Sequence, residues 1–115
     1  GDVSSETAEC KGYDLVPIGL IDTEAELIAL VALAGASKEN IDLRVTEDSL
    51  TVDARMVARE GKYLRQEMSS LPRHREIKLP LEIKPEQVKA SFRDGILEVR
   101  LPKLVVINAQ RVTVE

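Results

Sequence analysis

The chain has few side chains that could do chemistry, and their spacing is unfavourable for it. Its only histidine, His74, lies between Arg73 and Arg75, and its only cysteine, Cys10, has no histidine near it in the sequence. Two neighbouring cations do not activate an imidazole, so we expect His74 to be a solvated surface residue. Covalent catalysis needs a nucleophile, a base and a stabilising group. We therefore predict no catalytic residue and no enzymatic activity.

Metal and nucleotide sites are also unsupported. One cysteine and one histidine cannot supply the ligand set of a structural zinc, and the acidic residues form no spaced calcium loop. The sequence contains no Walker-type loop and no GxGxxG motif. The short basic cluster at residues 73–75 is more typical of a strand that is solvated or forms salt bridges than of a phosphate site. We expect no metal and no cofactor.

Charge and composition narrow the class of partner. The net charge is −4, the pI is about 5.1 and only 3% of the residues are aromatic. These values argue against nucleic acid and anionic membrane as partners. No apolar run approaches the ~18 residues that a membrane span needs, and residues 1–11 lack the order of a secretory signal. With one cysteine, a reducing compartment is expected, and we predict a cytoplasmic location.

The middle of the chain has the alternation of β-strands. Apolar residues alternate with polar ones at Ile41, Leu43 and Val45, and again over residues 50–54. A second pair of alternating runs covers residues 88–92 and 97–101, with Asp94-Gly95 between them as a tight turn. These patterns predict an all-β protein of 115 residues with one domain.

Residues 23–36 (TEAELIALVALAGA) are ambiguous. Thr23 and Glu26 form a capping-box pattern and Gly35 could end a helix, so local propensity favours a helix. The nearly continuous apolar run also fits a strand that is buried on both faces of a sandwich. The local evidence leaves both readings open.

Four stretches, in this order, resemble the small heat shock proteins. They are residues 33–41 (LAGASKENI), residues 63–67 (YLRQE), residues 90–103 (ASFRDGILEVRLPK) and Val112-Thr113-Val114. The third is the most specific, because it combines the alanine, turn glycine and Leu-Pro-Lys ending of the family signature. The resemblance covers roughly residues 15–115, and it is to the prokaryotic or archaeal type.

The resemblance implies a fold and domain limits. The fold would be an immunoglobulin-like antiparallel β-sandwich, the α-crystallin domain, with a strand-swapping loop. Residues 1–12 would be a short flexible leader, residues 13–103 the domain and residues 104–115 a C-terminal extension. Residues 24–33 would then form a sandwich strand and not a helix.

The resemblance also implies two self-association sites. In the dimer, a loop from one chain would pair with an acceptor edge of its partner. The loop residues would be Tyr63, Leu64, Arg65, Gln66 and Glu67, and the acceptor residues Pro17, Ile18, Gly19, Leu20 and Ile21. The tail motif, Val112 and Val114, would occupy a groove on a neighbouring dimer. The residues of this groove for tail or client would be Ile41, Leu43, Val45, Val88, Ala90 and Phe92.

The implied function is that of an ATP-independent holdase chaperone, with unfolding client proteins and further copies of itself as partners. One alternative is a co-chaperone domain of the CS type, which shares the sandwich but docks on a larger chaperone. A plain β-sandwich adhesion or ligand-binding module is a third, weaker reading. A compact monomer would favour the CS type.

Overall fold

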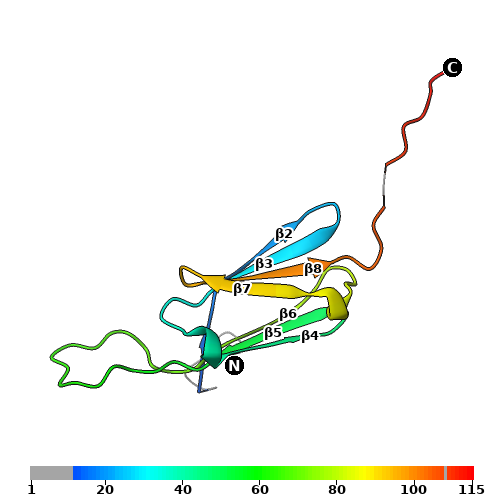
Figure 1. Ribbon diagram of the computed structural model, residues 1–115. Coiled ribbons are helices and arrows are strands. Elements are labelled where there is room, and N and C mark those ends of the chain that lie inside the picture. The colour runs from blue at the N-terminus through cyan, green and yellow to red at the C-terminus, as the bar shows by residue number, and fades with distance from the viewer. Residues whose placement is uncertain (1–11, 108) are drawn as a thin grey trace, which may run out of the picture.

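The chain folds into two facing four-stranded sheets, here called sheet A and sheet B (Figure 1). The computed structural model describes residues 12–107 and 109–115. Sheet A has the order β1 (Asp14–Leu15), β6 (Arg73–Lys78), β5 (Ser49–Ala54) and β4 (Ile41–Val45). Sheet B has the order β2 (Ile18–Asp22), β3 (Glu26–Ala32), β8 (Ile96–Pro102) and β7 (Lys89–Arg93). All strand pairs are antiparallel except β1 with β6. The predicted all-β sandwich is confirmed.

Two short 3₁₀ helices complete the elements, at Lys38–Asn40 before β4 and at Pro85–Gln87 before β7. No α-helix occurs in the described part of the chain. Within that part, no helix is long and apolar enough to cross a membrane.

The core is aliphatic and lies between the two sheets. Every second residue of β3, β5 and β8 is buried, as a strand with one face on a core requires. Each such valine, leucine or isoleucine stabilises the fold by about 1.5–3 kcal/mol when it is fully buried. The buried residues are Val16, Leu27, Ala29, Val31, Leu33, Leu50, Val52, Ala54, Leu79, Ile83, Leu97, Val99 and Leu101.

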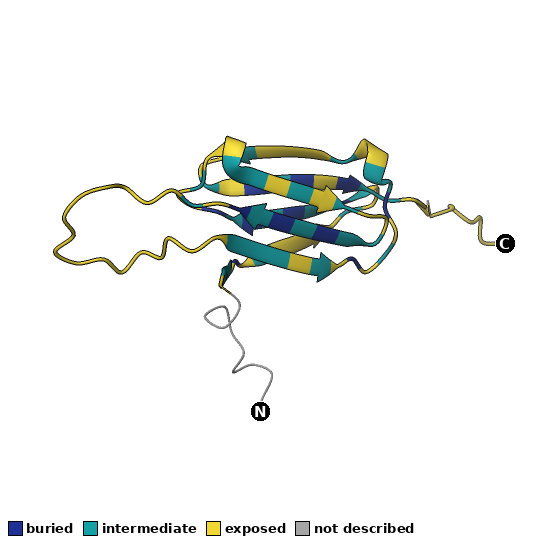
Figure 2. Cartoon of the chain, turned by 90° about the horizontal axis from the view of Figure 1, so that it is seen from below, coloured by how far each residue is buried: buried dark blue, intermediate teal, exposed yellow. Residues whose placement is uncertain are grey.

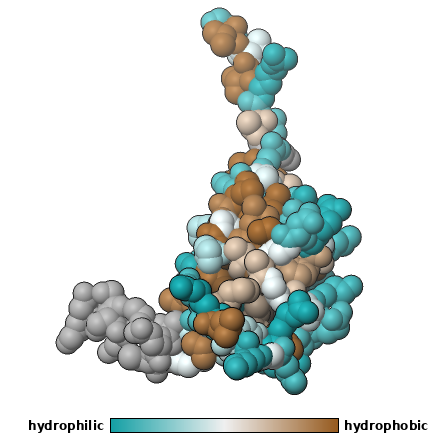
Figure 3. Space-filling view, turned by 90° about the vertical axis from the view of Figure 1, so that its left-hand side faces the viewer, coloured by the Kyte–Doolittle hydropathy of each residue, from teal (hydrophilic) through white to brown (hydrophobic). Residues whose placement is uncertain are grey.

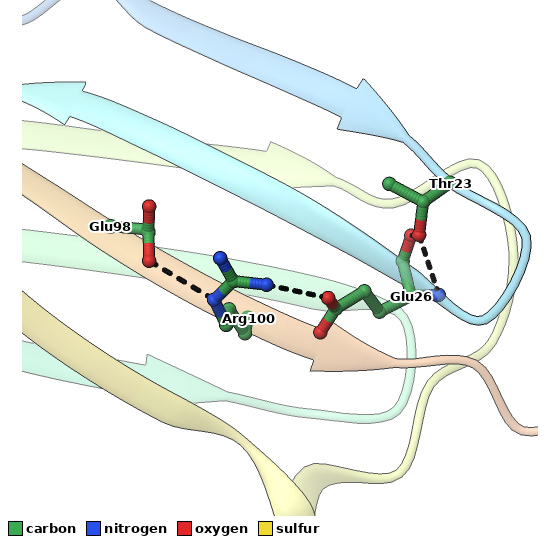
Figure 4. Close-up of polar contacts among 4 residues, drawn as sticks. All are labelled: Thr23, Glu26, Glu98 and Arg100. Carbon is green, nitrogen blue, oxygen red and sulfur yellow. Dashed lines mark hydrogen bonds and ion pairs between the residues drawn. The ribbon is translucent and has the colours of Figure 1, made fainter.

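The helix that local propensity favoured at residues 23–36 is absent, and the strand prediction is correct. Glu26–Ala32 forms β3, which pairs with β2 on one side and β8 on the other. The two capping-box residues do interact, but in the turn between β2 and β3. The Glu26 backbone N–H donates to the Thr23 hydroxyl (3.1 Å), and that hydroxyl donates to the Glu26 carbonyl (2.7 Å; Figure 4). Burial in the sandwich outweighs the helix propensity of the segment.

The Asp94-Gly95 turn forms as predicted. Asp94 has φ 54° and Gly95 has φ 76°, the left-handed values that a two-residue hairpin needs at both positions. The turn also packs closely, because a Cβ on Gly95 would lie 3.2 Å from the Ala34 Cα. The Gly95 carbonyl accepts a hydrogen bond from the Leu33 N–H (2.7 Å), which ties the turn to the end of β3.

The prediction that His74 is a solvated surface residue is wrong. Its side chain is half-buried, and its Nδ1 lies 2.6 Å from an Asp53 carboxylate oxygen. The Tyr13 ring packs edge-on against the imidazole at 4.6 Å between centroids. Asp53 is the direct partner of His74 in the β5–β6 register, and sequence reasoning did not identify that pairing.

The two flanking arginines form salt bridges and backbone hydrogen bonds, as one of the two expected readings had it. Arg73 pairs with the Asp14 carboxylate (3.2 Å), and Arg75 donates to the Val16 carbonyl (3.0 Å). Both contacts hold residues 14–16, which include β1, against β6. Val16 is buried in the core, so this segment is part of the packed domain.

Candidate functional site

The predicted acceptor edge lies on an open strand. β2 is the first strand of sheet B, and within the described residues its only strand neighbour is β3. The other side of β2 therefore presents backbone N–H and C=O groups that no strand pairs. β2 spans Ile18–Asp22, so Pro17 precedes the strand and the other four predicted residues, Ile18, Gly19, Leu20 and Ile21, lie within it. All except the partly buried Ile18 are exposed.

The predicted dimer loop is a long excursion between β5 and β6. Residues 55–72 contain no strand, and residues 57–72 are exposed throughout (Figure 2). The predicted loop residues 63–67 form no strand in the single chain, where no other strand pairs with them. Tyr63 donates its hydroxyl to the Arg59 carbonyl (2.5 Å), and Arg65 pairs with Glu67 within the same loop (2.9 Å).

The loop encloses a hollow that the sequence did not indicate. It measures about 620 Å³, and its lining includes both methionines, Met56 and Met68, and Tyr63. Met56 packs toward the turn after β3, and its methyl lies 3.3 Å from where a Cβ on Gly35 would be. The side chains of the loop therefore leave an unfilled, largely apolar hollow beside it.

The predicted groove lies where the edges of the two sheets meet. β4 ends sheet A and β7 ends sheet B, and a depression of about 170 Å³ lies between them. Four of the six predicted residues line it, together with three others, so the full lining is Lys38, Ile41, Leu43, Ala90, Ser91, Phe92 and Leu97. Val45 and Val88 do not line it and instead pack partly buried against the core. Lys38 and Leu97 were missed because the preceding 3₁₀ helix and the adjacent strand β8, and not the two edge strands, supply them.

The tail leaves the domain and extends away from it. It starts beyond the bridge between Ile83 and Lys103 and runs outward (Figures 1 and 2). Val112 and Val114 are 78% and 93% exposed. In the space-filling view the tail rises to the top of the molecule and carries apolar surface near its end (Figure 3). The described tail residues therefore present the motif to solvent and not to the groove of the same chain.

Charge is distributed unevenly between the loop and the acceptor edge. Residues 55–72 contain four cationic residues (Arg55, Arg59, Lys62, Arg65) and two acidic ones (Glu60, Glu67), a difference of +2. Residues 13–24, which include β2, contain three acidic residues (Asp14, Asp22, Glu24) and no lysine or arginine, which gives −3. Asp14 and Asp22 are already paired with Arg73 and Lys103 of the same chain, so the difference in charge adds little to contact between copies.

The outward face of β3 and β8, the two central strands of sheet B, carries an ion-pair network (Figure 4). Arg100 donates to Glu98 (3.1 Å) and to Glu26 on β3 (2.7 Å). The hydrogen bond to Glu98, followed by the charges of Glu98 and Glu26, raises the pKa of Arg100 above its ordinary value. The network fixes β3 to β8 on this face. No cluster of metal-binding side chains occurs among residues 12–107 and 109–115.

Comparisons with known proteins give one answer. The Hsp20/alpha crystallin family matches residues 21–115. Small heat shock protein C4 of Rickettsia felis is 29% identical over 99 residues, and heat shock protein HSP.16.4 of Streptococcus thermophilus is 31% identical over 96 residues. These alignments cover 83% and 78% of this chain and 61% and 67% of the two relatives, so the chain spans about two thirds of their length or less.

A solved structure agrees in fold. HSP18.5 from E. histolytica superposes with a TM-score of 0.72 at 24% identity, covering 88% of this chain and 97% of that one. The β-sandwich fold and the family match over residues 21–115 therefore indicate the same family. The chain belongs to the Hsp20/alpha crystallin family, the small heat shock proteins, which is a family of chaperones and not of enzymes.

Proposed function

We propose that this chain is an ATP-independent holdase chaperone that binds unfolding proteins and assembles from dimers through its tail. The observation that carries the proposal is the open groove between β4 and β7, with its apolar lining at the meeting point of two sheet edges. An unfolding protein exposes apolar segments and unpaired backbone. The apolar segments would bind in the groove, and the unpaired backbone would hydrogen-bond to the edges of β4 and β7.

Dimer formation would use the loop and the β2 edge. Residues 63–67 of one copy would add to β2 of the other as a further strand of sheet B. Two features of the chain support this pairing. Within the described residues β2 has a strand on one side only, and residues 63–67 are exposed and pair with no strand of their own chain. The swap is mutual, so a dimer would contain it twice.

Higher assembly would use the tail. Val112 and Val114 are exposed in the single chain and share the two-residue spacing of side chains on one face of a strand. Burying two valines gives roughly 3–6 kcal/mol before association entropy is subtracted. Each tail contact alone would therefore be weak, and many on one assembly would be strong together. Weak contacts suit a holdase, because a tail that leaves its groove exposes that groove to clients.

The test is suppression of thermal aggregation of a thermolabile protein, measured by light scattering without nucleotide. We expect the full chain to suppress aggregation, and Ala90→Glu to weaken that suppression because it places a charge in the groove. Ala90 is exposed, so this change leaves the core intact. Gln87→Glu is the matched control, since it adds the same charge at an exposed position outside the groove lining. Suppression that Ala90→Glu leaves unchanged would remove the groove from the proposal.

A further inference from the structure

The face of sheet B that points away from sheet A carries a run of apolar side chains. Leu27, Ala29 and Val31 of β3 are buried in the core, so the residues between them point outward. Strand register adds neighbours from β2 and β8 to the same face. This outer stripe consists of Ile21, Ile28, Leu30, Ala32 and Ile96. Ile21 and Ile96 are exposed, and the other three are only partly buried.

The stripe is most open on the side of β2, at Gly19. Gly19 pairs with Leu30 in the β2–β3 register, and a Cβ built on Gly19 would meet nothing within 4 Å. The outer side of Leu30 is therefore not covered from β2. A side chain on a further strand added beside β2 could reach across the glycine to Leu30, since neighbouring strands lie only about 4.8 Å apart.

The opposite half of the same face is already occupied by charges. Arg100 is bonded to Glu98 and to Glu26, and its neighbour on β7 is Lys89. An apolar occupant gains nothing there. The open part of the stripe is therefore the part that adjoins the free edge of β2.

The loop offers one apolar side chain that matches this position. Leu64 is 94% exposed, more than any other large apolar side chain of the loop. In an extended strand, Leu64 and Gln66 would lie on one face, and Tyr63, Arg65 and Glu67 on the other. The ion pair between Arg65 and Glu67 (2.9 Å) already places those two side chains on a common side.

We propose that, in the dimer, Leu64 of one copy packs on the outer stripe of its partner beside Gly19 and Ile21, and so fixes which face of the swapped strand points outward. The inference rests on the proposed pairing of the loop with β2. Both segments are five residues long, and with Arg65 opposite Leu20, residues 64 and 66 fall opposite residues 19 and 21 for either strand direction. A shift of one residue would instead point Leu64 to the other face and the charged pair onto the stripe, and hydrophobic pattern selects against such a slip.

Disulfide cross-linking tests directly which face of the swapped strand carries Leu64. In chains with Cys10→Ser, Leu64→Cys is combined with either Gly19→Cys or Ile21→Cys. The matched controls combine Arg65→Cys with the same two partners. Residues that face each other on neighbouring strands meet the 4.4–6.8 Å Cα separation of a disulfide, whereas side chains on opposite faces do not meet. We expect a covalent dimer on mild oxidation with Leu64→Cys in at least one combination, and none with Arg65→Cys.

Covalent dimers with Arg65→Cys alone would overturn the inference and leave the loop pairing intact. No covalent dimer in all four variants, with the solution mass still dimeric, would show that another surface pairs. A monomeric wild-type chain would overturn the pairing and this inference together.

A second experiment measures the dissociation constant of the dimer. Leu64→Ser should raise the dimer dissociation constant about 100- to 10,000-fold, because the mutual swap loses two buried leucine side chains and each loss is worth about 10- to 100-fold. Val57→Ser is the control, because Val57 is an exposed apolar residue of the same loop (72%) outside residues 63–67. Equal dissociation constants for Leu64→Ser and the wild type would overturn the inference.

Discussion

Nδ1 of His74 lies 2.6 Å from Oδ1 of Asp53, and the two residues are direct partners in the β5–β6 register. On its other side Asp53 is the direct partner of Asp42 on β4. Asp42, Asp53 and His74 therefore lie in one row across sheet A, with the two carboxylates side by side. His74 contacts Asp53, and Arg44 pairs with Asp42 (3.0 Å). Like charges directly opposite each other destabilise a sheet unless such partners compensate them.

The two aspartates should therefore respond differently to alanine. Asp53→Ala leaves the half-buried His74 without its hydrogen-bond partner, and should lower the free energy of unfolding by about 0.5–1.5 kcal/mol. Asp42→Ala removes only an exposed ion pair, so it should change stability by about 0.5 kcal/mol or less. Either substitution relieves the repulsion between the two aspartates, so the difference between them reports the contact with His74. Chemical denaturation of both variants measures the two changes in unfolding free energy. Equal losses would mean that the Asp53–His74 contact adds nothing.

The loop should be needed for the dimer. Deleting residues 60–68 removes the strand that we propose to swap, and should yield monomers by light-scattering mass. A Gly-Ser linker of the same length in place of these residues should also yield monomers, because it keeps the connection but lacks Tyr63, Leu64 and Arg65. Dimers that persist in the deletion would show that pairing uses another edge.

The tail valines should be needed for assembly beyond the dimer. Replacing Val112 and Val114 by Ala removes about 1–2 kcal/mol of burial per valine, and should shift the mass toward dimers where the wild type is larger. The control replaces Val105 and Ile107 by Ala, which have the same spacing and are also exposed. If the control dissociates the assembly and the Val112–Val114 variant does not, the contact belongs to the start of the tail.

Gly95, in the turn between β7 and β8, and Gly19, on β2, should differ in their tolerance of a side chain. Gly95→Ala forces an alanine to φ 76° with its Cβ 3.2 Å from the Ala34 Cα, and should cost about 1–3 kcal/mol of unfolding free energy. Gly19→Ala meets no atom within 4 Å and needs no positive φ, so it should change stability by less than about 1 kcal/mol. Thermal or denaturant unfolding distinguishes them, and similar losses for both would contradict the close approach at the turn.

Much of the fold could be predicted from local sequence. The alternation at Ile41, Leu43 and Val45 and the Asp94-Gly95 turn encode strands and a hairpin over a few residues, and both formed as expected. β3 could not be predicted this way. Its Ala, Leu and Glu residues favour a helix locally, and only burial between β2 and β8 makes it a strand.

The parts that sequence reasoning missed depend on contacts between distant segments. Asp53 and His74 are 21 residues apart and meet only because of the β5–β6 register. The outer stripe was missed for a related reason. A continuous apolar run predicts burial on both faces of a strand, whereas here the outward residues Ile28 and Leu30 remain partly open. The groove residue Leu97 likewise comes from a strand behind the edge.

The loop and the tail leave the sandwich at opposite ends (Figure 2). Two attachments so far apart can be made and broken independently. On our proposal, a tail could release while the swapped strands stay paired, so that intact pairs would be the units that move between assemblies. Mixing two differently labelled preparations would then produce hybrids in steps of two chains.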